Sequence, residues 1–412
     1  MKSNYKPIGD FIQLVDNRNK ALKKLPLIGV TVNKKFIPSV ANTIGTNMKN
    51  YKLIRKNQFA CSLMQVRRDG KIPVALMKED EAIISQAYPV FEIMDTDKLL
   101  PQYLMMWMSR SEFDREACFY AVGGVRGSLE WEDFCAMQLP VPSAEKQKEI
   151  VKEYHTIEKR IQLNEQLNQK LEETAQAIYK EWFVDFGFPD ENGKPYKSSG
   201  GKMVYCDELG VEIPMEWDIQ DLVKLSTIKS GKRLPKGKTL VKDKTNYPYT
   251  RIANLGSFKY TFLSEGFEYL NENTQKQISK YTVSINDLII SIVGTIGVVK
   301  IIDSSLDGAN LTENCMKVID LEKVSVDYLY YYLNSKIGQK EIENRTVGGV
   351  QGKLPMYNIE SLRIICPNRT IMTKFDKLVK SISNTQKSYI FEFVKLFQIR
   401  DILLAKMATI KD

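Results

Sequence analysis

Residues 123–129 read GGVRGSL, and residues 348–354, which lie 225 positions later, read GGVQGKL. The same shift relates a tyrosine–leucine pair and a proline in the two copies: Tyr103-Leu104 with Tyr328-Leu329, and Pro142 with Pro367. Between residues 103 and 142 the copies align without a gap, and 10 of the 40 positions are identical. A chance match would not keep one register through all of these features, so the chain is a tandem duplication.

Upstream of residue 103 the two copies diverge. A weak echo survives, because residues 57–62 resemble residues 286–291 at a shift of 229. The change of shift means that insertions separate these points. The variable part of each copy therefore lies in front and the similar part behind, as expected if a common scaffold carries two different recognition surfaces.

A heptad pattern follows each copy, after Ser143 and Asn368 as predicted N-caps. The predicted seams are Ile150, Tyr154, Ile157, Ile161, Asn164, Asn168, Leu171, Ala175, Ile178 and Trp182, and Phe375, Val379, Ile382, Gln386, Tyr389, Phe393, Leu396, Arg400, Leu403 and Met407. About five sustained heptads predict a coiled coil. The alternative is that each amphipathic helix packs on its own domain. Polar residues inside both seams favour the coiled coil, because such residues specify register.

The remaining segments predict mixed secondary structure, and the fold class is therefore α+β. Residues 288–293 and 298–302 are β-branched runs that predict strands around a glycine turn. Residues 102–109 and 327–334 have helical character. Residues 189–201 are rich in Gly, Pro and Ser and predict a linker or an exposed loop.

The composition of the 412-residue chain predicts a globular protein of two or three domains. Its 59 basic and 50 acidic residues give a net charge of +9, which fits a phosphate-binding protein and is equally compatible with plain solubility. No apolar run is long enough for a membrane span, and residues 1–10 lack the apolar core of a signal peptide. We therefore expect a cytoplasmic protein without a membrane partner. The six cysteines form no C-x-x-C pair, which argues against a disulfide framework or a zinc site.

Catalytic and cofactor motifs are missing from the sequence. The single histidine, His155, excludes histidine pairs and triads. The segment from Gly231 to Thr239 has the wrong spacing for a P-loop and contains Pro235. The glycine loops at residues 123–127 and 348–352 do not match a dinucleotide fingerprint, and we found no adenine-methyltransferase or nuclease motif. The chain is therefore expected to be non-catalytic, with no metal site and no cofactor of its own.

Basic residues interleaved with aromatic ones occur in the front part of both copies. A lysine run is more often a solvated loop than a binding site, but its recurrence in both copies favours DNA binding, with lysines on phosphates and Arg or Asn on base edges. The candidate residues in the first copy are Lys52, Arg55, Arg67, Arg68 and Lys71; those in the second are Lys232, Arg233, Lys236, Lys238, Arg251, Asn254 and Tyr260.

The order of these features resembles that of type I restriction-modification specificity subunits. Residues 145–150, EKQKEI, look like the opening of the family's conserved helix, and residues 182–186, WFVDF, look like its central segment. Residues 291–297 and 213–217 are similar to segments of its target-recognition domains. Two departures are visible: residues 368–372 lack the Glu-x-Gln pair of the helix opening, and the first domain lacks the Ile-Pro…Trp start.

The resemblance implies two target-recognition domains of duplicated fold, separated by two long helices that form an antiparallel coiled coil. The implied boundaries are a first recognition domain at 1–142, a first conserved helix at 143–186, a linker at 187–212, a second recognition domain at 213–367 and a second conserved helix at 368–412. Each domain would recognise half of a bipartite site in double-stranded DNA. The glycines expected to dock partner subunits are Gly123, Gly124, Gly127, Gly348, Gly349 and Gly352.

The resemblance also implies partners that supply the chemistry. Two modification subunits would bind S-adenosylmethionine and methylate adenine at N6 after flipping it out. Restriction subunits would use ATP and Mg²⁺ for translocation and cleavage. Two other classes remain open: a standalone DNA-acting enzyme with an unrecognised site, and a coiled-coil adaptor that makes no DNA contact.

Overall fold

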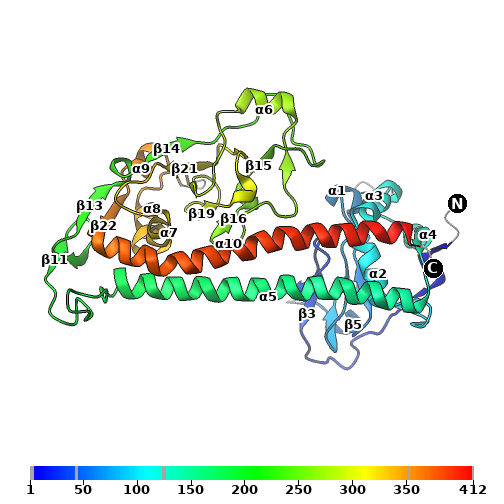
Figure 1. Ribbon diagram of the computed structural model, residues 1–412. Helices are drawn as coiled ribbons and strands as arrows, with labels where there is room; N and C mark the ends of the chain where they lie inside the picture. Colours follow the sequence, from blue (N-terminus) through cyan, green and yellow to red (C-terminus); the bar gives the residue numbers. More distant parts are fainter. Residues whose placement is uncertain (1–3, 42–44, 123–126, 350–351, 411–412) are drawn as a thin grey trace. The chain divides into compact units, whose positions relative to one another are not determined.

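The computed structural model describes residues 4–41, 45–122, 127–349 and 352–410. The chain forms two compact units, one made of Met1–Arg160 with Gln398–Asp412 and the other of Ile161–Phe397. Each unit contains a mixed α+β domain and a part of the two long helices, α5 and α10 (Figure 1).

The domain of the first unit is built on two four-stranded sheets. The antiparallel sheet has the order β2-β9-β6-β7, and the second sheet has the order β4-β3-β8-β5 with β3 and β8 parallel. Phe59 and Phe91 stack face to face in the core, with ring centroids 4.9 Å apart. The strands are β2 (Ile12–Leu14), β3 (Leu27–Val30), β4 (Phe36–Pro38), β5 (Lys52–Arg55), β6 (Phe59–Cys61), β7 (Val74–Leu76), β8 (Glu81–Ile84) and β9 (Val90–Ile93); the helices are α1 (Val66–Asp69), α2 (Pro101–Met108), α3 (Ser111–Tyr120) and α4 (Trp131–Ala136).

The domain of the second unit has a five-stranded sheet of order β14-β21-β18-β19-β16 and a three-stranded sheet of order β17-β15-β20. The strands are β14 (Thr227–Ser230), β15 (Pro248–Thr250), β16 (Tyr260–Thr261), β17 (Glu268–Tyr269), β18 (Leu288–Ser291), β19 (Val299–Ile302), β20 (Asn310–Leu311) and β21 (Cys315–Ile319). The helices are α6 (Glu272–Ile278), α7 (Val326–Asn334), α8 (Lys336–Asn344) and α9 (Met356–Glu360). The predicted strand–turn–strand is β18 and β19, joined through Gly294 and Gly297, which both have positive φ.

The predicted duplication is visible in the strand order of the two units. The order β2-β9-β6-β7 corresponds to β14-β21-β18-β19, and the parallel pair β3·β8 corresponds to β15·β20. Hydrogen bonds also recur at the shift of 225. The hydroxyl of Tyr103 donates to the Pro140 carbonyl at 3.2 Å, and that of Tyr328 donates to the Ile365 carbonyl at 2.7 Å. In both units the tyrosine of the repeated tyrosine–leucine pair therefore ties a helix to the strand that precedes a long helix.

That strand pairs in each unit with the strand that opens the domain. In the first unit β1 (Tyr5–Pro7) is antiparallel to β10 (Gln138–Pro140). In the second unit β13 (Asp218–Asp221) is antiparallel to β22 (Arg363–Cys366). The domain is thus closed by its own ends, immediately before the long helix begins.

The two long helices are α5 (Ala144–Phe183) and α10 (Arg369–Lys406), drawn in green and in orange to red in Figure 1. Both predicted N-caps are confirmed. The Ser143 hydroxyl accepts a hydrogen bond from the Lys146 amide at 3.4 Å, and the Asn368 side chain accepts one from the Ile371 amide at 3.0 Å. Every residue of the two predicted seams is buried or half-buried, so the heptad pattern identified the buried faces correctly.

The helices run antiparallel within each unit. In the second unit, Tyr179 lies beside Phe375 and Glu172 beside Gln386, so the residue number rises on α5 as it falls on α10. In the first unit an ion pair of 3.6 Å joins Glu158 to Arg400. The fold class is therefore the predicted one: α+β domains of duplicated fold with two long antiparallel helices.

The segment expected to be a linker, residues 187–212, has more structure than its composition predicts. Phe188 stacks on Tyr196 and on Trp217, with ring centroids 4.7 and 5.1 Å apart. The strand β11 (Met203–Cys206) then pairs with β12 (Val211–Pro214). Aromatic stacking on Trp217 orders a stretch that its glycines and serines alone would leave flexible.

Candidate nucleic-acid interface

The basic loop of the second unit, residues 232–244, leaves the sheet at the end of β14. Gly231 is required there, because a Cβ atom would lie 1.9 Å from the carbonyl oxygen of Thr312. The Tyr249 hydroxyl donates to the Lys232 carbonyl at 2.7 Å and fixes the start of the loop. A turn at Gly237, with φ of +76°, then places exposed Lys236 and Lys238 on either side of it.

These lysines carry uncompensated charge. In the described part of the chain, neither Lys236 nor Lys238 forms an ion pair, whereas Arg233 is held by Glu313 at 2.7 Å. Lys232 is exposed, with its ammonium 5.4 Å from the centre of the Tyr281 ring. The loop therefore presents a positive surface to solvent, as a phosphate-binding segment would.

The other candidates of the second domain are less accessible. Arg251 is half-buried and pairs with Glu268, and Asn254 uses its side-chain oxygen to accept the Arg251 amide at 3.0 Å. Tyr260 is only 2% exposed, beneath the amines of Lys259 and Lys387. Our expectation of direct DNA contact by Tyr260 is therefore wrong, because its ring is part of the packing between the domain and α10.

The candidate residues of the first domain likewise divide into a buried residue and several exposed ones. Lys52 lies in β5, is 9% exposed, and donates to the Tyr88 carbonyl at 2.9 Å. We correct the prediction that Lys52 contacts DNA, because its amine satisfies a backbone carbonyl. Arg55 is exposed and shares Glu81 with Lys23, and these two hydrogen bonds lower the pKa of Glu81.

Arg67, Arg68 and Lys71 are exposed and lie in or just after the short helix α1. Gly127, the last glycine of the first glycine loop, packs against this segment. The Arg67 amide donates to the Gly127 carbonyl at 3.2 Å, and a Cβ on Gly127 would lie 2.4 Å from that of Arg67. Gly127, with φ of +66°, therefore supports the basic segment directly.

The described residues of the second glycine loop and its flanks also pack on neighbouring structure. The backbone of Lys353 forms isolated β-bridges with Val347 and with Val293, which lies in the turn between β18 and β19. A Cβ atom on Gly352 would contact Ile296 in the same turn. Gly348 has φ of +101°, while Gly349 has open space around its Cα atom. The expected docking residues Gly123 and Gly124 lie outside the described residues. Docking of a partner on these loops stays a prediction.

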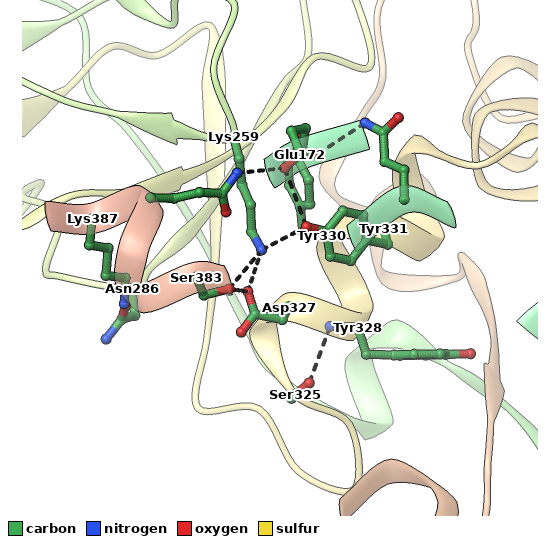
Figure 2. Close-up of polar contacts among 12 residues, drawn as sticks. Glu172, Lys259, Asn286, Ser325, Asp327, Tyr328, Tyr330, Tyr331, Ser383 and Lys387 are labelled. Carbon is green, nitrogen blue, oxygen red and sulfur yellow. Dashed lines mark hydrogen bonds and ion pairs between the residues drawn. The ribbon is translucent and has the colours of Figure 1, made fainter. Parts of the chain in front are cut away.

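A buried polar network joins the second domain to both long helices (Figure 2). Lys259 is 2% exposed; its amine lies 2.5 Å from Asp327 and donates to the Tyr331 and Ser383 hydroxyls at 3.1 and 3.2 Å. Glu172 of α5 accepts hydrogen bonds from Tyr331 at 3.3 Å and from Gln386 of α10 at 3.0 Å. A buried charge is tolerated only when it is paired, so this cluster fixes one orientation of the domain on its part of the helices.

Sequence reasoning missed this network. The predicted seam contains Leu171 and does not include its neighbour Glu172. A Tyr-Tyr-Tyr run at residues 330–332, packed beside the seam, was the available signal of a polar contact there.

Two further observations concern chemistry and location. Among the residues that the structure describes, no group of three or more His, Cys, Asp and Glu side chains could hold a metal ion. In the same part of the chain, no helix is long and apolar enough to cross a membrane.

Comparison with known proteins decides the family. The model of the type I restriction modification DNA specificity domain matches residues 2–173 and again residues 214–390. The chain belongs to this family. The double match agrees with the duplication, because each specificity domain covers one α+β domain and part of the long helix that follows it.

Individual relatives of these specificity domains are distant. The chain is 25% identical to the type I restriction enzyme MjaIX specificity subunit of Methanocaldococcus jannaschii, over 74% of this chain and 67% of the relative. It is 23% identical to the HindI specificity subunit of Haemophilus influenzae, over 80% and 81%. A crystal structure of a type I restriction-modification S subunit from M. genitalium superimposes with a TM-score of 0.52 at 16% identity, over 98% and 95% of the two chains. This last likeness concerns the fold.

Proposed function

We propose that this chain is the non-catalytic, DNA-recognising subunit of a type I restriction-modification complex in the cytoplasm. Each domain would recognise one half of an asymmetric bipartite sequence in double-stranded DNA, and the antiparallel helices would set the length of the unread spacer. The observation that carries the proposal is the duplicated fold. The two domains share a four-strand order and a parallel strand pair, and they present different side chains in their front parts.

The basic residues that remain exposed divide into two roles under this proposal. Lys71, Lys232, Lys236 and Lys238 would contact phosphates, because a lysine ammonium acts as a point charge. Arg67 could in addition donate two parallel hydrogen bonds to a guanine edge in the major groove. Arg55, Arg68 and Arg233 would do so only after leaving their carboxylate partners. Arg251 and Asn254 would contribute only if Arg251 left Glu268.

The chemistry would come from partner subunits. Two modification subunits carrying S-adenosylmethionine would dock on the helices and the glycine loops and methylate adenine at N6. Restriction subunits would supply the ATP- and Mg²⁺-dependent steps. The chain alone should accordingly show no methylation, cleavage or ATP hydrolysis. Turnover by the purified chain that a mutation of one of its own residues abolishes would instead make it an enzyme.

A domain exchange tests the proposal. Residues 218–360 are replaced by the same region of a relative, the chimera is expressed with its partner subunits, and N6-methyladenine is mapped across the genome. One half of the methylated sequence should change while the other half is kept, because base contacts would lie in the exchanged region. A change in both halves, or in neither, would show that the two domains do not act as separate recognition units.

A further inference from the structure

Two lysines face each other on neighbouring strands of the second domain. In the antiparallel pair β14·β21, Lys229 lies directly opposite Lys317. Residues in such positions have Cβ atoms about 4.5–5.5 Å apart, and like charges there are destabilising. Lys317 lies 2.9 Å from Asp287, whereas Lys229 is exposed and forms no ion pair in the described part of the chain. One positive charge of the pair is therefore left uncompensated.

The lysine pair borders a hollow of about 280 Å³. Lys280 and Tyr281 line it from the segment after α6, and Ser230 and Thr282 add hydroxyl groups. Lys280 is exposed and, like Lys229, has no ion pair among the described residues. Since Tyr281 also lies against the amine of Lys232, the hollow adjoins the basic loop. Apart from the apolar side chains of Ile228, Leu311 and Met356, the lining consists of three lysines and hydroxyl groups, and the only carboxylate nearby is Asp287, which pairs with Lys317. This excess of ammonium groups favours an anion.

The first domain shows that the fold does not require these lysines. The corresponding strands are β2 and β9. When Phe59 of β6 is matched to Leu288 of β18, the strand registers make Val90 the counterpart of Lys317 and Val15 the counterpart of Lys229. The Val15 amide donates to the Val90 carbonyl at 2.8 Å, and both side chains pack in an apolar cluster, so the two lysine positions carry no charge in the first domain.

Protection of an edge strand accounts for only part of this pattern. Lysines on edge strands discourage sheet-to-sheet aggregation, and β14 is an edge strand. However, Lys317 belongs to β21, which has a neighbour on each side, and Lys280 lies outside the sheet. A shared ligand explains all three positions.

We propose that this hollow seats a single backbone phosphate of the DNA that the second domain binds, and that the first domain has no equivalent seat. The inference rests on the proposed DNA-binding function and adds an asymmetry to it. The second half-site would be held with a steeper salt dependence than the first, because each neutralised phosphate releases counterions.

The first test compares two double variants of the full chain in complex with its partner subunits. Lys229→Gln/Lys280→Gln removes the free charges of the seat. Lys336→Gln/Lys340→Gln removes two exposed lysines of α8 and serves as the control. The Kd for a duplex containing the mapped methylation site is measured between 50 and 200 mM salt. The seat variant should lower the log–log salt slope by about 0.9, which shrinks the affinity change across this range by about 3.5-fold. The control should leave the slope unchanged.

The second test locates the phosphate on the DNA. Single neutral methylphosphonates are placed along the half-site read by the second domain, and each duplex is titrated with wild type and with the seat variant. A methylphosphonate at one position should weaken duplex binding by wild type and leave binding by the seat variant unchanged, which is the signature of coupling in a double-mutant cycle. Excess inorganic phosphate should not reproduce this loss of affinity. A second seat variant, Lys229→Val/Lys280→Gln, places the first domain's residue at the exposed position of the lysine pair and should behave like the first.

The outcomes separate two failures. If wild type binds the duplex but the seat variants keep its slope and its methylphosphonate profile, the phosphate seat is wrong and DNA recognition stands. If inorganic phosphate alone abolishes the difference in duplex affinity between wild type and the seat variant, the hollow binds free anions and the seat is likewise overturned. If wild type with its partners binds no duplex, the proposed function itself has failed.

Discussion

At the scale of single residues, the Lys259 cluster should be the most sensitive point of the second domain. Lys259→Met removes the buried ammonium shared by Asp327 and the Tyr331 hydroxyl, and leaves half-buried Asp327 with only the Ser383 hydroxyl as a donor. We expect the free energy of unfolding to fall by about 3 kcal/mol, because an unpaired buried charge is costly. Urea denaturation measures this decrease.

A matched pair of variants controls this prediction. Lys340→Met, at an exposed position, should leave the stability within about 0.5 kcal/mol of wild type. Lys259→Met/Asp327→Leu removes both charges and should recover most of the stability. A double variant as unstable as the single one would mean that shape, rather than charge pairing, governs the site.

Lys300 gives a prediction about pH. Burial lowers the pKa of its ammonium from 10.5 to about 8, and the amine donates to the Phe258 carbonyl at 2.5 Å. Below pH 8 the group is charged in the folded and unfolded states alike, so the burial penalty is present in full. Between pH 8 and 10.5 the unfolded chain binds more protons than the folded one, so this group makes stability rise with pH.

Lys300→Met removes that contribution. The stability of wild type relative to Lys300→Met should therefore increase between pH 7 and pH 10, by on the order of 2 kcal/mol. Urea titrations of both proteins at a series of pH values measure the difference. A difference that is constant with pH, or that falls as pH rises, contradicts a buried ammonium at this position.

At the scale of elements, the loop at residues 232–244 carries the clearest electrostatic prediction. Lys236→Glu/Lys238→Glu should weaken DNA binding and flatten its salt dependence, by about 0.9 in slope for each phosphate that the loop no longer neutralises. These two lysines are preferred to Arg233, because reversing Arg233 would also repel Glu313 and disturb the loop. An unchanged slope in a folded variant would place this loop away from the DNA.

At the scale of the whole molecule, the helices α5 and α10 should act as the spacer of the recognised sequence. Adding one helical turn to both lengthens each by about 5.4 Å, which is between one and two base-pair steps of about 3.4 Å. The unread spacer should grow by one or two base pairs while both half-sites keep their bases. Methylome sequencing of the lengthened protein with its partners measures the spacer, and an unchanged spacer would reject the helices as its determinant.

Local patterns in the sequence were sufficient for the parts of this protein that repeat or are periodic. The duplication, the two N-caps and both helix seams follow from residue order and a heptad period, because a helix is built from contacts between residues three and four apart. The exposure of Lys236, Lys238, Arg67, Arg68 and Lys71 also agrees with their sequence context.

The tertiary structure decided what depends on long-range packing. Lys52 is buried because neighbouring β-structure covers it. Tyr260 is covered by its own sheet and also by α10. Glu172 is buried because α7 and α10 meet at its side chain. Lys229 and Lys317 become neighbours only through the pairing of β14 with β21. Sequence alone does not specify which distant strands pair or what lies over a side chain, whereas the charge and hydrogen bonding of a site depend on both.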